Sequence, residues 1–273
     1  MTALPAQANR SQIAPRDTWL VLALTLLVIV LCVVSLVVGR VPLAFLSTLQ
    51  EMFAGERSTD ALILSEIRVP RAILAVLVGA TLGGAGAAMQ GLLRNPLAEP
   101  GILGVSASAG LGAVIVLYFG FAQTFSFALP IAGMVGALTA VLLTYVLSGR
   151  DASILTLILA GVALNAFAAA LTSLALNLAP SPYAALEIVF WLLGSLADRS
   201  FEHVGIALPL MLLGGFLFIG TGRALDALSL GEDVARSLGI NLRVVRARLI
   251  LGTALAVGAA VSVSGTVGFV GLV

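Results

Sequence analysis

The sequence has no lysine, one cysteine and one histidine, and each shortage removes a class of function. All 14 basic residues are arginine, so the chain lacks the lysine of a phosphate-binding loop and any lysine for Schiff-base chemistry. If ATP drives this protein, another chain hydrolyses it. Cys32 has no second cysteine for a disulfide within the chain, and it lies in an apolar run where a thiol acts as a small hydrophobe.

Charged residues are also scarce, at 10% of the sequence against 60% hydrophobic residues, and the net charge is +1. This composition predicts a polytopic membrane protein. The absence of a basic block excludes an electrostatic surface for nucleic acid. His203 has no second histidine to work with, so we assign it no role. We expect no catalytic residues, no metal site and no cofactor on this chain.

Uncharged apolar runs predict an all-α fold with about seven transmembrane helices, each near the ~20 residues needed to cross a bilayer. The predicted spans are residues 18–39, 72–93, 101–119, 128–148, 153–178, 204–222 and 249–270. The apolar run 188–197 is too short to cross, and Trp191 suits an interface, so we predict a re-entrant or surface-lying helix there. In the loop 40–66, the spacing of Leu46, Leu49 and Phe53 predicts a short amphipathic helix.

The distribution of arginine predicts the topology. If the chain starts inside, nine arginines fall on one side of the membrane and five on the other. The arginine-rich side belongs in the cytoplasm. We therefore predict a cytoplasmic N-terminal segment, residues 1–17, and a transmembrane domain, residues 18–273, with residues 226–241 as a cytoplasmic segment. Arg68 and Arg71 then face outward.

Residues 226–241 form a charged island in this apolar sequence. Ser229 and Glu232 have the spacing of a capping box, in which the hydroxyl accepts from the Glu232 amide, so a helix should begin at Leu230. Gly239 can adopt a left-handed conformation and end this helix after Leu238.

This short helix is predicted to be amphipathic. Leu230, Val234 and Leu238 recur every fourth residue and line one face with Ala227. The opposite face carries the charged and polar residues Glu232, Asp233, Arg236 and Ser237. An isolated helix of this length is marginal in water, so something must pack on its apolar face. On periodicity alone, a connector lying on the membrane surface is the commoner arrangement.

Glycine and proline mark two other features. Gly79, Gly83, Gly84 and Gly86 predict close helix packing in the second span. In residues 94–100, two prolines disfavour helix at the residues before them, so the chain must turn. Pro70 likewise predicts an extended Val69 and a fixed separation between Arg68 and Arg71.

Several motifs together resemble permease subunits of ATP-binding-cassette importers for iron-siderophores, haem and vitamin B12, the iron-chelate uptake permease family. They are IRVPR at 67–71, GATLGGAGAAMQGLLRNPLAEPGILGVSASAG at 79–110, LILAGVALN at 157–165, FWLLGSL at 190–196, LSLGEDVARSLGIN at 228–241 and SGTVGFVGLV at 264–273. The similarity covers residues 67–273. RNPLAEPGILGVS followed by GEDVARSLG is specific to this family.

The resemblance implies a type II importer permease with ten transmembrane helices. Similar proteins continue beyond Val273, so we expect a chain truncated at its C-terminus, with about seven of the ten helices present. The implied partners are two cytoplasmic ATPase subunits that bind ATP and Mg²⁺, a second permease in a homodimer or heterodimer, and a periplasmic or lipid-anchored substrate-binding protein. The implied location is the bacterial inner membrane.

The resemblance also assigns roles to individual residues. The helix in segment 226–241 becomes the element that couples to the ATPase, through Ser229, Gly231, Glu232, Ala235, Arg236, Leu238 and Gly239. We expect Glu232, Ala235, Arg236 and Leu238 to face the ATPase. Asn95, Pro96 and Leu97 belong to a cytoplasmic gate, and Arg68 and Arg71 dock the binding protein. Met89 and Gln90 are candidates for the translocation path, with core packing as the alternative.

Two other functions fit part of the sequence. A secondary transporter would share the small-residue helices, but it usually needs ionisable groups inside its spans, and the predicted spans contain none. A membrane-embedded enzyme would need clustered His, Asp, Glu or Cys residues, which the sequence lacks. Both are less consistent with the sequence than an importer permease.

Overall fold

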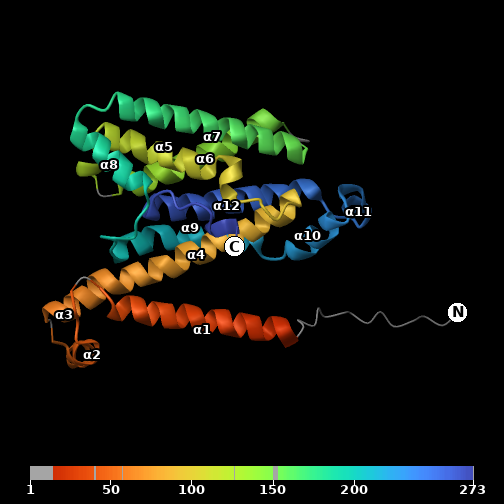
Figure 1. Ribbon diagram of the computed structural model, residues 1–273. Helices are drawn as coiled ribbons and strands as arrows, with labels where there is room; N and C mark the ends of the chain where they lie inside the picture. The colour runs from red at the N-terminus through yellow and green to blue at the C-terminus, as the bar shows by residue number, and fades with distance from the viewer. Residues whose placement is uncertain (1–14, 40, 57, 126, 150–152, 273) are drawn as a thin grey trace. The chain divides into compact units, whose positions relative to one another are not determined.

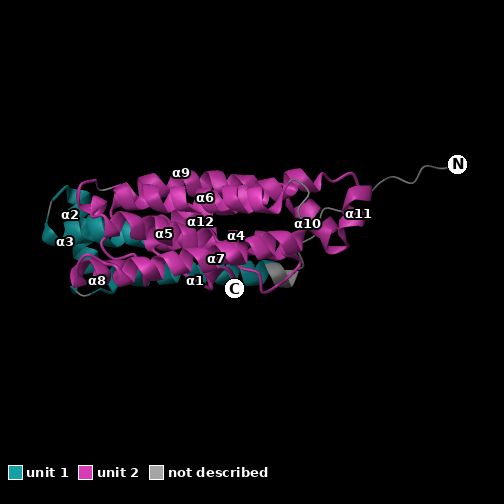
Figure 2. Ribbon diagram, turned by 90° about the horizontal axis from the view of Figure 1, so that it is seen from above, with its two compact units in different colours: residues 1–72 teal, residues 73–273 magenta. Residues whose placement is uncertain are grey.

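The computed structural model describes residues 15–39, 41–56, 58–125, 127–149 and 153–272, and no strand occurs among them (Figure 1). Contacts divide the chain into two compact units, Met1–Ala72 and Ile73–Val273 (Figure 2). Helix α4, Val69–Leu93, begins in the first unit and continues in the second. The predicted all-α membrane fold is confirmed.

The first unit contains α1 (Pro15–Val37), α2 (Phe45–Ala54), α3 (Thr59–Leu62) and the π-helix Ile63–Arg68, which leads into α4. Helix α2 is the predicted amphipathic helix of the loop. The side chain of Ser58 caps α3 by accepting from the Ala61 amide at 3.1 Å.

The prediction of an extended residue before Pro70 is wrong. Val69 is helical, with φ −64° and ψ −50°, and its amide donates to the carbonyl of Leu64 five residues earlier. A proline lacks the amide for the preceding helical turn, and its ring crowds the carbonyl four residues back. The wider π-turn immediately before Pro70 re-pairs the backbone at this point, so the helix continues through the proline.

The second unit contains the remaining helices and three 3₁₀ turns. They are Pro100–Leu103 (3₁₀), α5 (Val105–Tyr118), Phe121–Gln123 (3₁₀), α6 (Ala128–Ser148), α7 (Ile154–Asn177), α8 (Pro182–Leu192), α9 (Phe201–Phe218), α10 (Gly222–Ser229), α11 (Glu232–Ser237), α12 (Leu242–Ser264) and Val270–Leu272 (3₁₀).

Six helices of the described chain are long and apolar enough to cross a membrane. They are Thr18–Val37, Thr59–Leu93, Ala128–Ser148, Ile154–Asn177, Phe201–Phe218 and Leu242–Ser264. The predicted span 101–119 is instead a 3₁₀ turn followed by the 14-residue α5, with Gly104 between them at φ 77°. The chain is therefore a multi-pass membrane protein. At the seven predicted span positions, the described residues form six long helices and the shorter apolar helix α5.

Two helices begin earlier than predicted because polar residues cap them. Helix α8 starts at Pro182, where proline occupies the first helical position and Ser181 accepts from the Ala184 amide. Helix α12 starts at Leu242, and the Asn241 side chain accepts from the Val244 amide at 3.3 Å. Trp191 of α8 is only 9% exposed, so its side chain packs within the protein.

Helix α12 lies at the centre of the second unit, where it packs on α9, α6 and α5 (Figure 1). From residue 252 to 264, every residue except Leu255 is buried. Glycine lets α9 come close: a Cβ atom on Gly214 would lie 2.6 Å from the carbonyl oxygen of Gly252 and 2.7 Å from the amide nitrogen of Ala256. Small residues therefore set the separation between these helices.

This packing predicts different effects for two adjacent glycines of α9. In Gly214→Ala the added methyl group collides with the α12 backbone, so we expect the variant to lose about 1–3 kcal/mol of stability. Gly215→Ala is the matched control, because nothing lies within 4 Å of its Cβ position. Thermal unfolding in detergent should show a lower midpoint for Gly214→Ala and an unchanged or higher one for Gly215→Ala. Equal midpoints would contradict the packing argument.

Candidate functional site

The charged segment 226–241 forms two short helices rather than one. Helix α10 ends at Ser229, and α11 begins at Glu232 after Gly231, which has φ 118°. The Ser229 hydroxyl donates to the Asp226 carbonyl at 2.6 Å instead of capping α11. The predicted capping box and the helix start at Leu230 are therefore wrong. Leu230 instead closes α10, since its amide donates to the carbonyl of Ala227.

The predicted end of this helix is confirmed. Gly239 has φ 80°, its amide donates to the Arg236 carbonyl at 2.9 Å, and the Ile240 amide donates to the Ala235 carbonyl at 3.1 Å. These two hydrogen bonds form a Schellman motif, which requires a left-handed residue and favours glycine there.

Three apolar side chains of this segment are exposed to the surroundings. Leu230, Val234 and Leu238, which we call the α11 ridge, are 70%, 40% and 64% exposed. Ala227 and Ala235 are buried instead, and Ala235 has no exposed surface. The expectation that Ala235 faces outward is therefore wrong, because the short side chain lies on the face that packs against the rest of the second unit.

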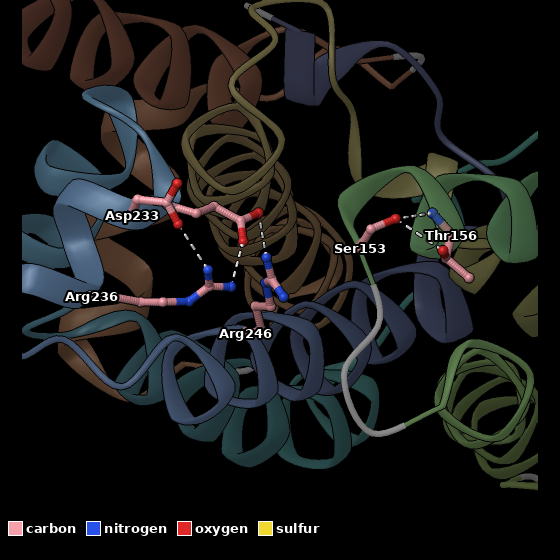
Figure 3. A network of polar contacts seen from close by, with 6 residues as sticks. Ser153, Thr156, Asp233, Arg236 and Arg246 are labelled. Atoms are coloured by element: carbon pink, nitrogen blue, oxygen red, sulfur yellow. Dashed lines mark hydrogen bonds and ion pairs between the residues drawn. The ribbon is translucent and has the colours of Figure 1, made fainter.

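The charged residues of α11 form a network that reaches α12 (Figure 3). Glu232 binds Arg236 at 3.0 Å and Arg246 of α12 at 2.6 Å, while Asp233 binds Arg236 at 3.1 Å. The side chain of Arg236 is 58% exposed, whereas that of Arg246 is 13% exposed. Sequence reasoning missed Arg246, since only the proximity of α11 and α12 brings it to Glu232.

The predicted gate turn is exposed and held by a local hydrogen bond. Asn95 Oδ1 accepts from the Leu97 amide at 2.9 Å, which is an Asx turn, and the Ala98 amide donates to the Asn95 carbonyl at 3.0 Å. The side chain of Leu97 is 74% exposed. Asn95, Pro96 and Leu97 therefore form a surface turn rather than a buried connection between helices.

The two candidate path residues differ in their surroundings. Met89 has no exposed surface and belongs to the apolar core, which is the packing alternative stated for it. Gln90 is partly exposed, and its Nε2 donates to the Gly271 carbonyl at 3.3 Å.

Two cavities lie in the second unit. One, of about 230 Å³, is mostly apolar in its lining and is bounded by α4, the segment after α8 and the end of α12. The other, of about 290 Å³, is lined in part by Glu99 and Asn165. Glu99 Oε2 accepts from the Phe269 amide at 3.3 Å, and Asn165 Nδ2 donates to the Gly101 carbonyl at 2.8 Å. No sequence pattern indicates this pairing of distant segments.

The two arginines expected to dock a binding protein also differ. Arg68 is 7% exposed, and its guanidinium donates to the carbonyls of Leu36 and Val37, both at 2.7 Å, and to that of Val41. These carbonyls lie at the end of α1, where a cation satisfies unpaired acceptors and opposes the helix dipole. The expectation that Arg68 faces outward is therefore wrong: its guanidinium is buried and hydrogen-bonded within the first unit. Arg71 is exposed.

Acidic and metal-ligating residues do not gather elsewhere in the described ranges. No group of three or more His, Cys, Asp or Glu residues there could hold a metal ion.

Comparison with known proteins gives close relatives. The chain is 42% identical to the uncharacterised ABC transporter permease YvrB of Bacillus subtilis over 77% of its length. It is 34% identical to the iron(3+)-hydroxamate import permease FhuG of B. subtilis over 93%, and 37% identical to the vitamin B12 import permease BtuC of Vibrio cholerae over 97%. It spans 61%, 78% and 77% of the lengths of these three proteins.

The fold and the family agree with these relatives. A solved metal-chelate type ABC transporter in an inward-facing conformation superposes with a TM-score of 0.82 at 29% identity, covering 94% of this chain and 79% of the other. The model of the FecCD transport family matches residues 26–273. The chain therefore belongs to the FecCD transport family.

Proposed function

We propose that this chain is the membrane-spanning permease subunit of an ATP-binding-cassette importer that takes up an iron-siderophore, haem or cobalamin-type chelate. The observation that carries this proposal is the exposed α11 ridge on a segment tied by Glu232 to the central helix α12. An apolar surface of this kind on a charged, extramembrane segment suits a protein partner. With no lysine for a phosphate-binding loop, the chain needs that partner to supply ATP hydrolysis.

The arginine distribution supports a cytoplasmic position for the ridge, with the N-terminus on the same side and the protein in the bacterial inner membrane. The ridge then contacts a cytoplasmic ATPase subunit, which binds ATP and Mg²⁺. A second permease subunit, identical or different, and an outer substrate-binding protein complete the importer. The chain itself is not an enzyme.

The substrate class rests on the relatives. They include permeases named for iron(3+)-hydroxamate, vitamin B12 and hemin, of which the hemin permease HmuU of Yersinia pestis is 34% identical over 92% of this chain. These cargoes are bulky metal chelates, so a path for them needs width more than charged ligands. The long spans are uncharged along their central stretches, as expected for a transporter powered from outside the membrane rather than by an ion gradient.

The α11 ridge gives the direct test of this function. Leu230→Ala and Leu238→Ala should each weaken binding of the ATPase subunit about tenfold, because each removes roughly 1.5 kcal/mol of apolar burial at the contact. Leu212→Ala is the matched control, since Leu212 is 61% exposed but lies within the spanning helix α9. The measurement is ATPase affinity for the purified permease. Unchanged affinity in both ridge variants would refute this docking surface.

Asn95 gives a test of the gate. Asn95→Ala removes the side-chain acceptor of the Leu97 amide and loosens the turn. We expect a higher basal leak of substrate or less uptake for each ATP hydrolysed, measured in proteoliposomes. Asn95→Asp retains the acceptor and should behave nearly as the original protein. If Asn95→Ala changes neither quantity, the turn has no gating role.

Arg71 gives a test of docking on the outer side. Arg71→Glu should weaken binding of the substrate-binding protein, most strongly at low ionic strength, because exposed charges are screened by salt. Arg68→Gln serves as the contrast: it should lower the thermal unfolding midpoint while leaving docking affinity largely intact, since Arg68 is buried against carbonyls of the first unit. Docking affinity that is unaffected by Arg71→Glu at any salt concentration would contradict a docking role for Arg71.

A further inference from the structure

Within the described residues, a partly buried ion pair joins residues 226–241, the coupling segment, to helix α12. Arg246 Nη2 lies 2.6 Å from Glu232 Oε1, and the two side chains are only 13% and 23% exposed. The neighbouring pair of Glu232 with Arg236 is within α11 itself and involves a side chain that is 58% exposed. Charged hydrogen bonds are stronger where water is partly excluded, so the pair of Glu232 with Arg246 is the stronger of the two. It is also the one that joins α11 to α12.

Helix α12 is long and closely packed. It has 23 residues, so it is about 34 Å long, enough to cross the hydrocarbon core of a bilayer. Its second half is buried almost throughout, and it packs on α9, α6 and α5. A close-packed helix of this kind transmits displacement along its axis rather than absorbing it by bending.

The far end of α12 is tied to the short helix α8. The Ser195 amide donates to the carbonyl of Ser264, the last residue of α12, at 2.7 Å. Two residues later, the Thr266 hydroxyl donates to the carbonyl of Leu192, where α8 ends. In both views α11 and α8 lie at opposite ends of α12 (Figures 1 and 2).

We propose that α12 transmits movement of the ATPase-docked α11 to α8 on the opposite side of the membrane. Arg246 is the positioning residue that holds α11 to α12. The inference rests on the proposed function and deepens it. Docking by the α11 ridge and transmission through the Glu232–Arg246 pair are then separate tasks. A variant that loses the ion pair keeps the ridge, so it should bind the ATPase without passing on its movement.

The test uses the permease assembled with its ATPase and binding protein in proteoliposomes. Arg246→Gln and Glu232→Gln should each bind and retain the ATPase, while the substrate taken up for each ATP hydrolysed falls about fivefold or more, the usual lower range of coupling between sites. Arg223→Gln is the matched control and should stay within about twofold of the original protein, since Arg223 is exposed on α10 and lies outside the coupling segment.

A spin label at the end of α8 gives a readout that lost stability alone would not move. Leu193 is 71% exposed, so Leu193→Cys, made with Cys32→Ser, accepts a label without entering the core. ATP binding should change the label's mobility in the original protein and in Arg223→Gln, but not in Arg246→Gln or Glu232→Gln. Glu232→Gln is the smaller change and serves if Arg246→Gln folds poorly.

Two results would overturn the inference: normal uptake per ATP in both ion-pair variants, or a label whose mobility still changes on ATP binding in both. Loss of ATPase binding in both variants would also overturn it, because the pair would then serve docking alone. Failure of the unmodified permease to bind an ATPase would instead refute the proposed function, and this control separates the two.

Discussion

Close contact between helix backbones is the constraint on which the second unit depends. In lipid, apolar side chains gain little by leaving their surroundings, so helices associate through packing and polar contacts. Here Gly214 and Gly252 let α9 approach α12, and a Cβ atom on Gly258 would lie 2.5 Å from that of Ala137 in α6. Small residues thus bring α12 to the centre of the unit, and this position gives it contact with the coupling segment at one end and α8 at the other.

Much of this fold could be predicted from apolar length alone. Charge-free runs located the spanning helices, and the spacing of apolar residues located α2 in the loop before α4. Their exact starts were harder, because a cap can extend a helix past charged residues, as Asn241 does for α12 and its three arginines. The π-turn before Pro70 was also hidden, since a proline rule describes one residue and not the backbone that compensates for it.

The coupling segment shows what local patterns can and cannot give. Gly239 ends α11 as predicted because a left-handed residue is a purely local need. The capping box failed because Ser229 belongs to the preceding helix α10, whose existence depends on the residues before it. The burial of Arg68 could not be predicted for a different reason: the carbonyls that it binds lie 27 to 32 residues away in the sequence. Only the folded chain brings such groups together.

The placement of charge decides where the movement of a partner can act on this protein. The central stretches of the long spans are uncharged, and arginines and acids concentrate in the connecting segments and the first turns of helices such as α12. A bilayer would penalise any other arrangement by several kcal/mol for each charge. A force applied from outside must therefore reach the apolar interior through polar groups at a helix end. Glu232 and Arg246 are such groups: one lies on the exposed segment, and the other on the helix around which the interior is packed.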